Sequence, residues 1–86
     1  MKTITFRGHK LKAKSLNLFG TQDYEYITNN LSIFVDHNKY DYTAIYNFQI
    51  TTAEWLEITV DAQTLKGALS KLNRKVESIK KKINRL

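Results

Sequence analysis

The stretch WLEITVDAQTLKGALSKLNRKVESIKKKINRL, residues 55–86, decides the fold because its hydrophobic pattern changes period. In residues 55–60 the aliphatic side chains stand at every second position, the pattern of a half-buried strand. From Ala62 onward, apolar residues recur at spacings of three and four, the pattern of an amphipathic helix. The sequence therefore predicts a strand that leads directly into a long helix.

Polar residues between the two patterns place the start of this helix. Either Asp61 or Thr64 can accept hydrogen bonds from the free N–H groups of a first helical turn. The helix is expected from Gln63 to about Asn84, and Gly67 weakens it by about 1 kcal/mol relative to alanine. We interpret the chain as one domain, with a sheet in residues 1–61 and a basic amphipathic helix in residues 62–86.

Upstream of this stretch the apolar pattern keeps a period of two. Residues 3–6 and 10–19 read as two early strands that turn near residues 7–10, with a shift of phase at Ser15 that indicates a bulge or a break. Leu16 and Leu18 continue the alternation after that shift.

Two further hairpins are expected. Asn29 and Asn30 tolerate the positive φ of a type I′ turn, and residues 36–41 read as a second turn before a long alternating strand. Short connections favour antiparallel pairing. The predicted fold class is α+β: an antiparallel sheet of roughly four to six strands followed by one long C-terminal helix packed on it.

Large aromatic side chains are expected inside so small a protein. A chain of 86 residues buries only roughly 60 to 65% of its unfolded surface, so its core is thin. We assign Phe34, Tyr46, Phe48 and Trp55 to that core.

The regular apolar stripe of the helix allows three interpretations. The first half can lie on the chain's own sheet, and the second half, from Ile79, can extend past the sheet as an exposed strip. The spacing also suits a coiled coil, but the positions flanking the stripe carry lysines and no acid. Pairing of two copies through this helix is therefore disfavoured.

Composition excludes several classes of protein. The chain has no cysteine, which excludes a disulfide framework and thiolate chemistry and fits a cytoplasmic protein. It has no apolar run near the ~18 residues of a membrane span and no secretory signal, so a membrane role is disfavoured. Abundant Asn, Lys, Ile and Tyr without proline indicate a phage or mobile-element origin.

Charge is segregated along the chain. Residues 1–22 carry five bases and no acid, residues 23–61 carry seven acids against Lys39, and residues 62–86 carry eight bases against Glu77. Two interpretations follow. The basic ends can form one patch for a polyanion, or the acidic middle can neutralise them within the fold.

The sequence contains no pattern that indicates catalysis. The three glycines are too scattered for a nucleotide-binding loop, and His9 and His37 lie far apart without cysteine, which makes a zinc site improbable. Asp36 and Asp41 are expected to flank a turn, where acids serve backbone hydrogen bonds. We therefore predict no enzyme activity, no metal and no cofactor.

The leading functional hypothesis is a small non-enzymatic protein that binds nucleic acid or a nucleoprotein through a basic surface. Lysine outnumbers arginine eleven to three, which favours phosphate contact over base reading. The predicted nucleic-acid-binding residues are Lys10, Lys12, Lys14, Lys71, Arg74, Lys75, Lys81, Lys82 and Arg85.

The alternative hypothesis is a protein–protein interaction module, such as a phage-encoded inhibitor of a host or defence complex. It would use the end of the helix and the tyrosines beside the acidic segment. The predicted partner-binding residues are Ile79, Ile83, Leu86, Tyr40 and Tyr42.

Overall fold

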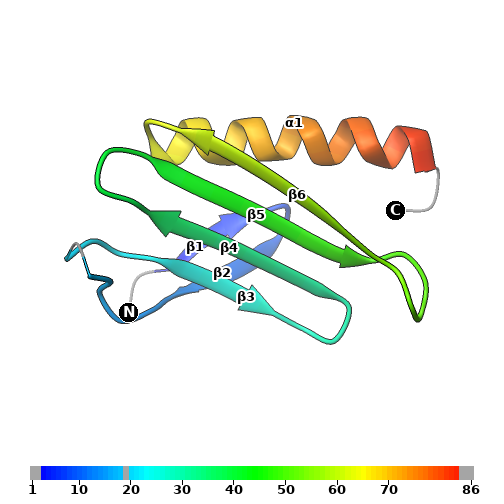
Figure 1. The fold of residues 1–86 in the computed structure, drawn as a ribbon, viewed down its shortest axis with the longest axis horizontal. Helices are drawn as coiled ribbons and strands as arrows, with labels where there is room; N and C mark the ends of the chain where they lie inside the picture. Colours follow the sequence, from blue (N-terminus) through cyan, green and yellow to red (C-terminus); the bar gives the residue numbers. More distant parts are fainter. Residues whose placement is uncertain (1–2, 19, 84–86) are drawn as a thin grey trace.

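A computed structural model of the chain describes residues 3–18 and 20–83 and shows six strands followed by one helix. The elements are β1 (Thr3–Phe6), β2 (His9–Ala13), β3 (Tyr24–Ile27), β4 (Leu31–His37), β5 (Tyr42–Gln49), β6 (Trp55–Ala62) and α1 (Leu65–Ile83). Each strand pairs antiparallel with the next, in the order β1-β2-β3-β4-β5-β6 (Figure 1). The predicted α+β fold, an antiparallel sheet with one C-terminal helix packed on it, is confirmed.

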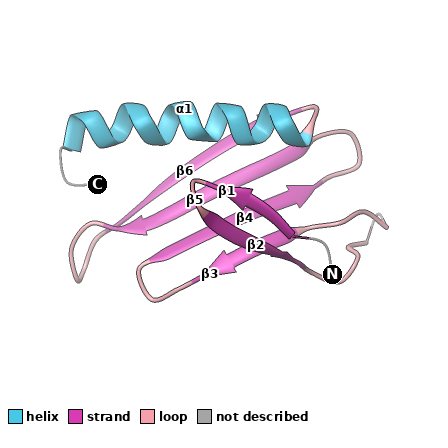
Figure 2. Ribbon diagram, turned by 180° about the vertical axis from the view of Figure 1, so that it is seen from behind, coloured by secondary structure: helices cyan, strands magenta, loops and turns pink. Residues whose placement is uncertain are grey.

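The sheet and the helix form two layers, and the N-terminal hairpin curls toward the helix. Seen from behind, β1 and β2 cross in front of the other strands and their turn approaches α1 (Figure 2). Arg7 in this turn donates a hydrogen bond to Asn73 of α1 over 2.6 Å. The ring of Phe6 also packs edge-on against Tyr46 of β5, with centroids 6.0 Å apart. The N-terminal hairpin and α1 therefore contact each other over one face of the sheet.

The turn between β1 and β2 has the type I′ geometry that the sequence pattern predicts for Asn29 and Asn30. Phe6 pairs with His9, so the loop has two residues, and Arg7 and Gly8 both have positive φ, 50° and 82°. This is the backbone of a type I′ hairpin turn. The predicted turn near residues 7–10 is confirmed.

The prediction of a type I′ turn at Asn29 and Asn30 is wrong, since neither residue has a positive φ. Thr28 closes this turn instead. Its N–H donates to the carbonyl of Leu31 over 2.8 Å, and its hydroxyl oxygen accepts the N–H of Leu31 over 3.1 Å. A hydroxyl can replace a backbone carbonyl in a turn, which removes the need for a left-handed backbone.

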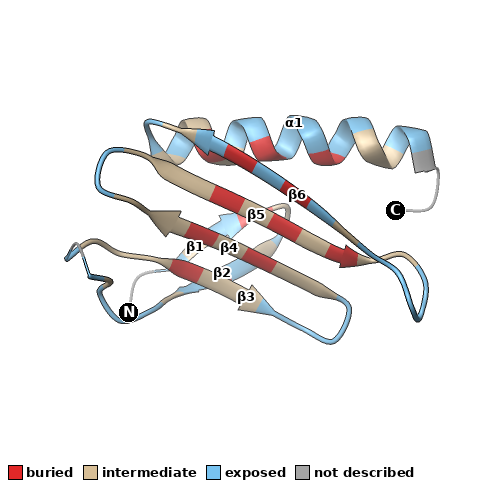
Figure 3. Cartoon of the chain, viewed as in Figure 1, coloured by how far each residue is buried: buried red, intermediate tan, exposed pale blue. Residues whose placement is uncertain are grey.

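The core lies between the sheet and α1, and alternate residues of the central strands supply it (Figure 3). The largest fully buried side chains are Leu11, Ile33, Leu72, Val35 and Val76.

Of the four aromatic side chains expected in this core, two are buried. Tyr46 and Phe48 confirm the prediction. Phe34 and Trp55 do not: Phe34 is half-buried and Trp55 is 50% exposed. Phe34 lies between buried Ile33 and Val35, so the alternation of a strand turns it to the opposite face. Size alone favoured these two rings, but strand parity decided against them.

Leu16 and Leu18 are not strand residues, contrary to the expected alternation. The chain leaves the sheet after Ala13, and the N–H of Lys14 bonds the carbonyl of Asp23 across the mouth of a loop. Leu16 is 65% exposed and Leu18 fully exposed. Within this loop, backbone bonds join Asn17 to Thr21 and Gly20, so local turns replace the ladder of a strand.

Helix α1 begins at Leu65, two residues later than expected. Thr64 is its N-cap, because the N–H of Gly67 donates to the Thr64 hydroxyl over 3.0 Å, whereas Asp61 lies in β6. Ala68, Leu72 and Val76 are buried, so the first half of the helix packs on the sheet as predicted.

The second half of α1 does not begin an exposed strip at Ile79. This side chain is half-buried against the core, and it lines a hollow together with Ile58 of β6. The sheet extends this far because β6 is eight residues long and its first half runs under the C-terminal half of the helix (Figure 1).

Candidate functional site

The solvent side of α1 carries most of the predicted nucleic-acid-binding residues. Ala68, Leu72 and Val76 hold the opposite side against the sheet. Because 3.6 residues complete a turn, the positions away from this buried stripe face solvent. The exposed bases of the helix are Lys66, Lys71, Arg74, Lys75, Lys81 and Lys82. We call this set the basic helix face.

No carboxylate of the described chain forms an ion pair with the basic helix face. The ion pairs among the described residues are Arg7 with Glu77 at 2.5 Å and Lys14 with Glu25 at 3.6 Å. Glu77 is the one acid of α1, and the hydrogen bond and charge of Arg7 hold its pKa below the usual range. Arg7 therefore neutralises the acid that would otherwise interrupt the basic helix face.

The N-terminal lysines lie elsewhere. Lys10 and Lys12 flank fully buried Leu11 in β2, so both point to the sheet face that α1 does not cover. We call it the open face; one row across it consists of Lys12, Glu25, Phe34, Ile45 and Thr59. The structure thus brings Lys71, Arg74 and Lys75 together but does not place them on one face with Lys10 and Lys12.

A groove runs between β6 and α1. One hollow of about 470 Å³ is lined by Lys71, Arg74 and Lys75 from the helix and by residues 59–61 from the strand. A second hollow, of about 310 Å³, adjoins it, shares Thr59 and Lys75 with it, and includes Lys82. Lys71 Nζ donates to the backbone carbonyl of Asp61 over 2.9 Å, so it bridges the groove at one end. We call the two hollows together the β6 groove.

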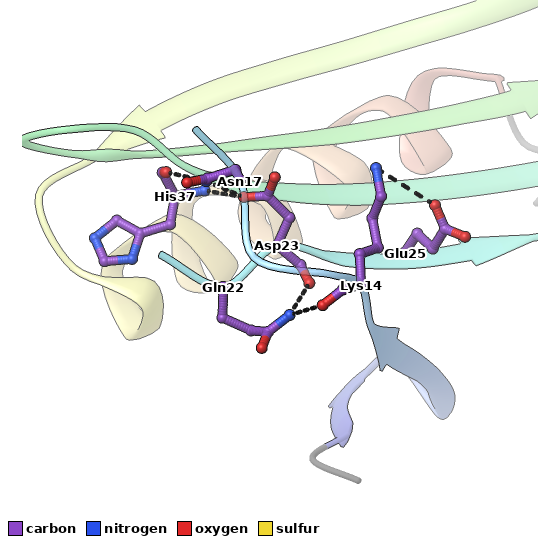
Figure 4. Close-up of polar contacts among 6 residues, drawn as sticks. All are labelled: Lys14, Asn17, Gln22, Asp23, Glu25 and His37. Carbon is purple, nitrogen blue, oxygen red and sulfur yellow. Dashed lines mark hydrogen bonds and ion pairs between the residues drawn. The ribbon is translucent and has the colours of Figure 1, made fainter. Parts of the chain in front are cut away.

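The loop before β3 is held by side chains rather than left free. Asn17 Nδ2 donates to Asp23 Oδ1 over 3.0 Å and to the carbonyl of His37 over 2.8 Å, and the N–H of His37 donates to Asp23 Oδ1 over 2.8 Å (Figure 4). Lys14, another predicted site residue, lies beside this network and pairs with Glu25 (Figure 4). Its charge is therefore already opposed by a carboxylate.

The acids of the middle segment have structural contacts. Asp41 lies in the turn before β5 as expected, but its carboxylate accepts a hydrogen bond from the side chain of Asn38, from Nδ2 over 3.0 Å, and not from the backbone. Asp36 lies within β4 rather than in the turn, which corrects the prediction for it. Burial and the nearby charge of Asp23 raise the pKa of Asp36. Among the described residues, no three His, Cys, Asp or Glu side chains are grouped as metal ligands would be.

The predicted partner-binding residues are dispersed. Tyr40 is 81% exposed in the turn between β4 and β5, with Lys39 Nζ 5.4 Å from its ring centre. Tyr42 stacks on His37 with centroids 4.0 Å apart. Figure 1 shows this turn at the end of the sheet where α1 begins, whereas Ile79 belongs to the opposite half of the helix.

Part of the predicted sites falls outside the described residues. This holds for Arg85 and Leu86 and for the side chain of Ile83.

Two features of the surface were missed by reasoning from the sequence. The first is the contact of Arg7 with Glu77, which joins residues 70 positions apart and leaves no local signal. The second is the pair of exposed leucines in the loop after β2, Leu16 and Leu18, which imitate a strand pattern.

Comparisons with protein families, with curated proteins and with solved structures gave no significant match. Within the described residues, no helix has the length and apolar character needed to cross a bilayer.

Proposed function

We propose that this protein is a non-enzymatic binding protein that engages nucleic acid, or a nucleoprotein, through the phosphates. The observation that supports this proposal is the basic helix face, where six exposed bases of α1 have no carboxylate partner among the described residues. Clustered cations bind a polyanion because they release the counterions condensed on it.

The spacing and type of these basic residues favour contact with the phosphate backbone of a nucleic acid over recognition of its nucleobases. Nineteen residues of helix extend over roughly 28 Å, long enough to follow several phosphates. Five of the six exposed bases are lysines, and a lysine meets a phosphate as a point charge without the two-pronged geometry that reads guanine. Binding should therefore be weakly selective for sequence and strongly dependent on salt. The phage or mobile-element origin suggested by composition remains part of this proposal.

Fluorescence anisotropy with random duplex DNA, single-stranded DNA and RNA, between 50 and 200 mM salt, tests this function. The variant Lys75→Glu/Lys81→Glu should weaken binding strongly and lower the salt slope by roughly one per lost phosphate contact. Lys10→Glu/Lys12→Glu changes the net charge equally but lies on the open face, so it is the matched control.

Two results would overturn the proposal. One is the absence of binding to any of the three nucleic acids at 50 mM salt. The other is equal loss in the two double variants, since that would assign binding to net charge and not to α1. Circular dichroism of both variants confirms that each is folded before they are compared.

A further inference from the structure

β6, one of the two outermost strands of the sheet, has an unpaired edge. Among the described residues it pairs with β5 alone, through eight residue pairs from Gln49 and Trp55 to Tyr42 and Ala62. An edge strand exposes a row of backbone N–H and C=O groups that another strand can complete.

The backbone bonds identify which groups form that row. In an antiparallel strand, the N–H and C=O of one residue point to the same neighbour and those of the next residue to the other side. The carbonyl of Glu54, just before β6, accepts the N–H of Ile50, so the even-numbered residues face β5. The carbonyl of Asp61 accepts Lys71 Nζ instead, so the odd-numbered residues face outward. The outward row therefore consists of Trp55, Glu57, Thr59 and Asp61, of which the carbonyl of Asp61 is already bonded to Lys71.

The β6 groove places positive charge beside this edge. The helix lines it with four cations, Lys71, Arg74, Lys75 and Lys82. The one acid of α1, Glu77, does not line the groove and pairs with Arg7 instead. The acids of β6 that line the groove are Glu57 and Asp61, but their side chains share the parity of Thr59 and point to the open face, where Asp61 Oδ1 accepts a hydrogen bond from the Thr43 hydroxyl over 2.7 Å. A strand laid against β6 on this side would place alternate side chains beside the helix cations.

We propose that the β6 edge binds an extended acidic segment of a partner protein as a seventh strand. The backbone of the segment would bond the outward groups of Glu57 and Thr59, and its acidic side chains, at every second position, would lie in the β6 groove. Alternate side chains of a strand recur at roughly 6.8 Å, close to the roughly 6 Å rise between Lys71 and Lys75. This inference goes beyond nucleic-acid binding, because a nucleic acid cannot continue a β-ladder.

A second copy of the chain fits the same edge poorly. Two β6 strands paired edge to edge would bring the lysines along both β6 grooves close together, and like charges in such an arrangement repel. The charge of the groove therefore selects an acidic segment over another copy of this protein.

The experiment is an NMR titration with a ten-residue peptide that alternates Glu and Thr. Backbone amide exchange at Glu57 and Thr59 should slow at least tenfold on peptide addition, whereas exchange at Ile58 and Val60, which already bond β5, should not change. A peptide of the same composition with its five Glu in one block is the control for charge, and a Lys–Thr alternating peptide is the control for sign. Equal protection by the block peptide, or none by the alternating one, would overturn the proposal.

Two variants of one residue separate this edge from the nucleic-acid surface. Thr59→Pro removes an outward N–H without breaking a bond to β5, and Thr59→Val keeps that N–H. The proline variant should lose at least tenfold in peptide affinity, the valine variant should bind as the parent does, and both should bind nucleic acid unchanged. If Thr59→Pro does not fold, amide exchange in the unaltered protein still decides the matter. Protection that appears with protein concentration and without peptide would show self-pairing and overturn the choice of occupant.

Discussion

Arg7 occupies a left-handed position in a two-residue turn and also neutralises the acid of a helix. Its φ of 50° belongs to a conformation that glycine or asparagine adopts more readily. The same turn directs its guanidinium to Asn73 and Glu77. In the sequence Arg7 is one of several N-terminal basic residues, but in the fold it neutralises the one acid of α1.

The bond between Arg7 and Glu77 predicts a pH dependence. Because the pKa of Glu77 is lowered in the folded state, the contact stabilises the protein above about pH 4.5, the ordinary value, and is lost as the pH falls through the lowered pKa. Glu77→Gln should therefore lower the unfolding temperature at pH 7, and the difference from the parent should disappear at acid pH.

Thermal unfolding followed by circular dichroism between pH 3 and 7 measures this effect. Glu54→Gln is the control, because Glu54 is exposed in a turn and has no ion pair among the described residues. A Glu77→Gln difference that stays constant across this pH range would contradict the assignment.

At the scale of elements, the junction between β6 and α1 was the part best predicted from sequence. The change of period, the cap and the glycine are all local features, and local hydrogen bonds decide them. The structure adds one fact about Gly67: a Cβ built there would lie 2.9 Å from the Thr64 hydroxyl oxygen. The cap and the glycine therefore depend on each other.

This dependence can be measured as a double-mutant cycle. Thr64→Ala alone should cost about 1 kcal/mol, the usual loss for a cap. Gly67→Ala alone should gain less than the ~1 kcal/mol of helix propensity, because the new methyl group displaces the capping hydroxyl. In the Thr64→Ala background the same change should give the full gain. Urea denaturation measures all four proteins, and additive effects would contradict the coupling.

Hydrophobic periodicity predicts structure less well here, because the same apolar alternation occurs in the strands and in the loop after β2. Leu16 and Leu18 alternate as a strand does, yet they lie in a loop because the ladder between β2 and β3 ends at Ala13 and Tyr24. The sequence of residues 14–18 does not by itself indicate that the strand ends at Ala13. Hydrogen bonds to the distant backbone of His37 fix the loop instead.

At the scale of the whole molecule, the curl of the sheet makes the N-terminal hairpin part of the core. Leu11 of β2 is as fully buried as Leu72 of α1. Leu11→Ala and Leu72→Ala should therefore each destabilise the protein by about 2 to 5 kcal/mol.

Both changes should act on one cooperative unit. Fluorescence of Trp55, on β6, and far-ultraviolet circular dichroism should report the same shifted transition for Leu11→Ala, although Leu11 and Trp55 lie in strands at opposite sides of the sheet order. Two separate transitions would show that the hairpin unfolds alone. Leu18→Ala is the control, because Leu18 is fully exposed and should change the unfolding free energy by less than about 0.5 kcal/mol.

Some features of the candidate site follow from the sequence, and others could be found only in the tertiary structure. The exposed lysines of α1 follow from the helix period, since residues off an apolar stripe must face water. That Lys10 and Lys12 lie on the open face, away from the basic helix face, required the register of β2 within the sheet. The edge of β6 required the strand order.

The sequence by itself determined the order of the elements, the antiparallel pairing, the capped helix and the apolar stripe that seats it. These depend on neighbours a few residues apart, whose spacing is written in the chain. The tertiary structure alone decided that Arg7 meets Glu77, that Phe34 and Trp55 face away from the core, and that β6 keeps an open edge beside four cations. Those contacts depend on the path of the whole backbone, and the curl of the sheet, which sets that path, sums small twists over six strands.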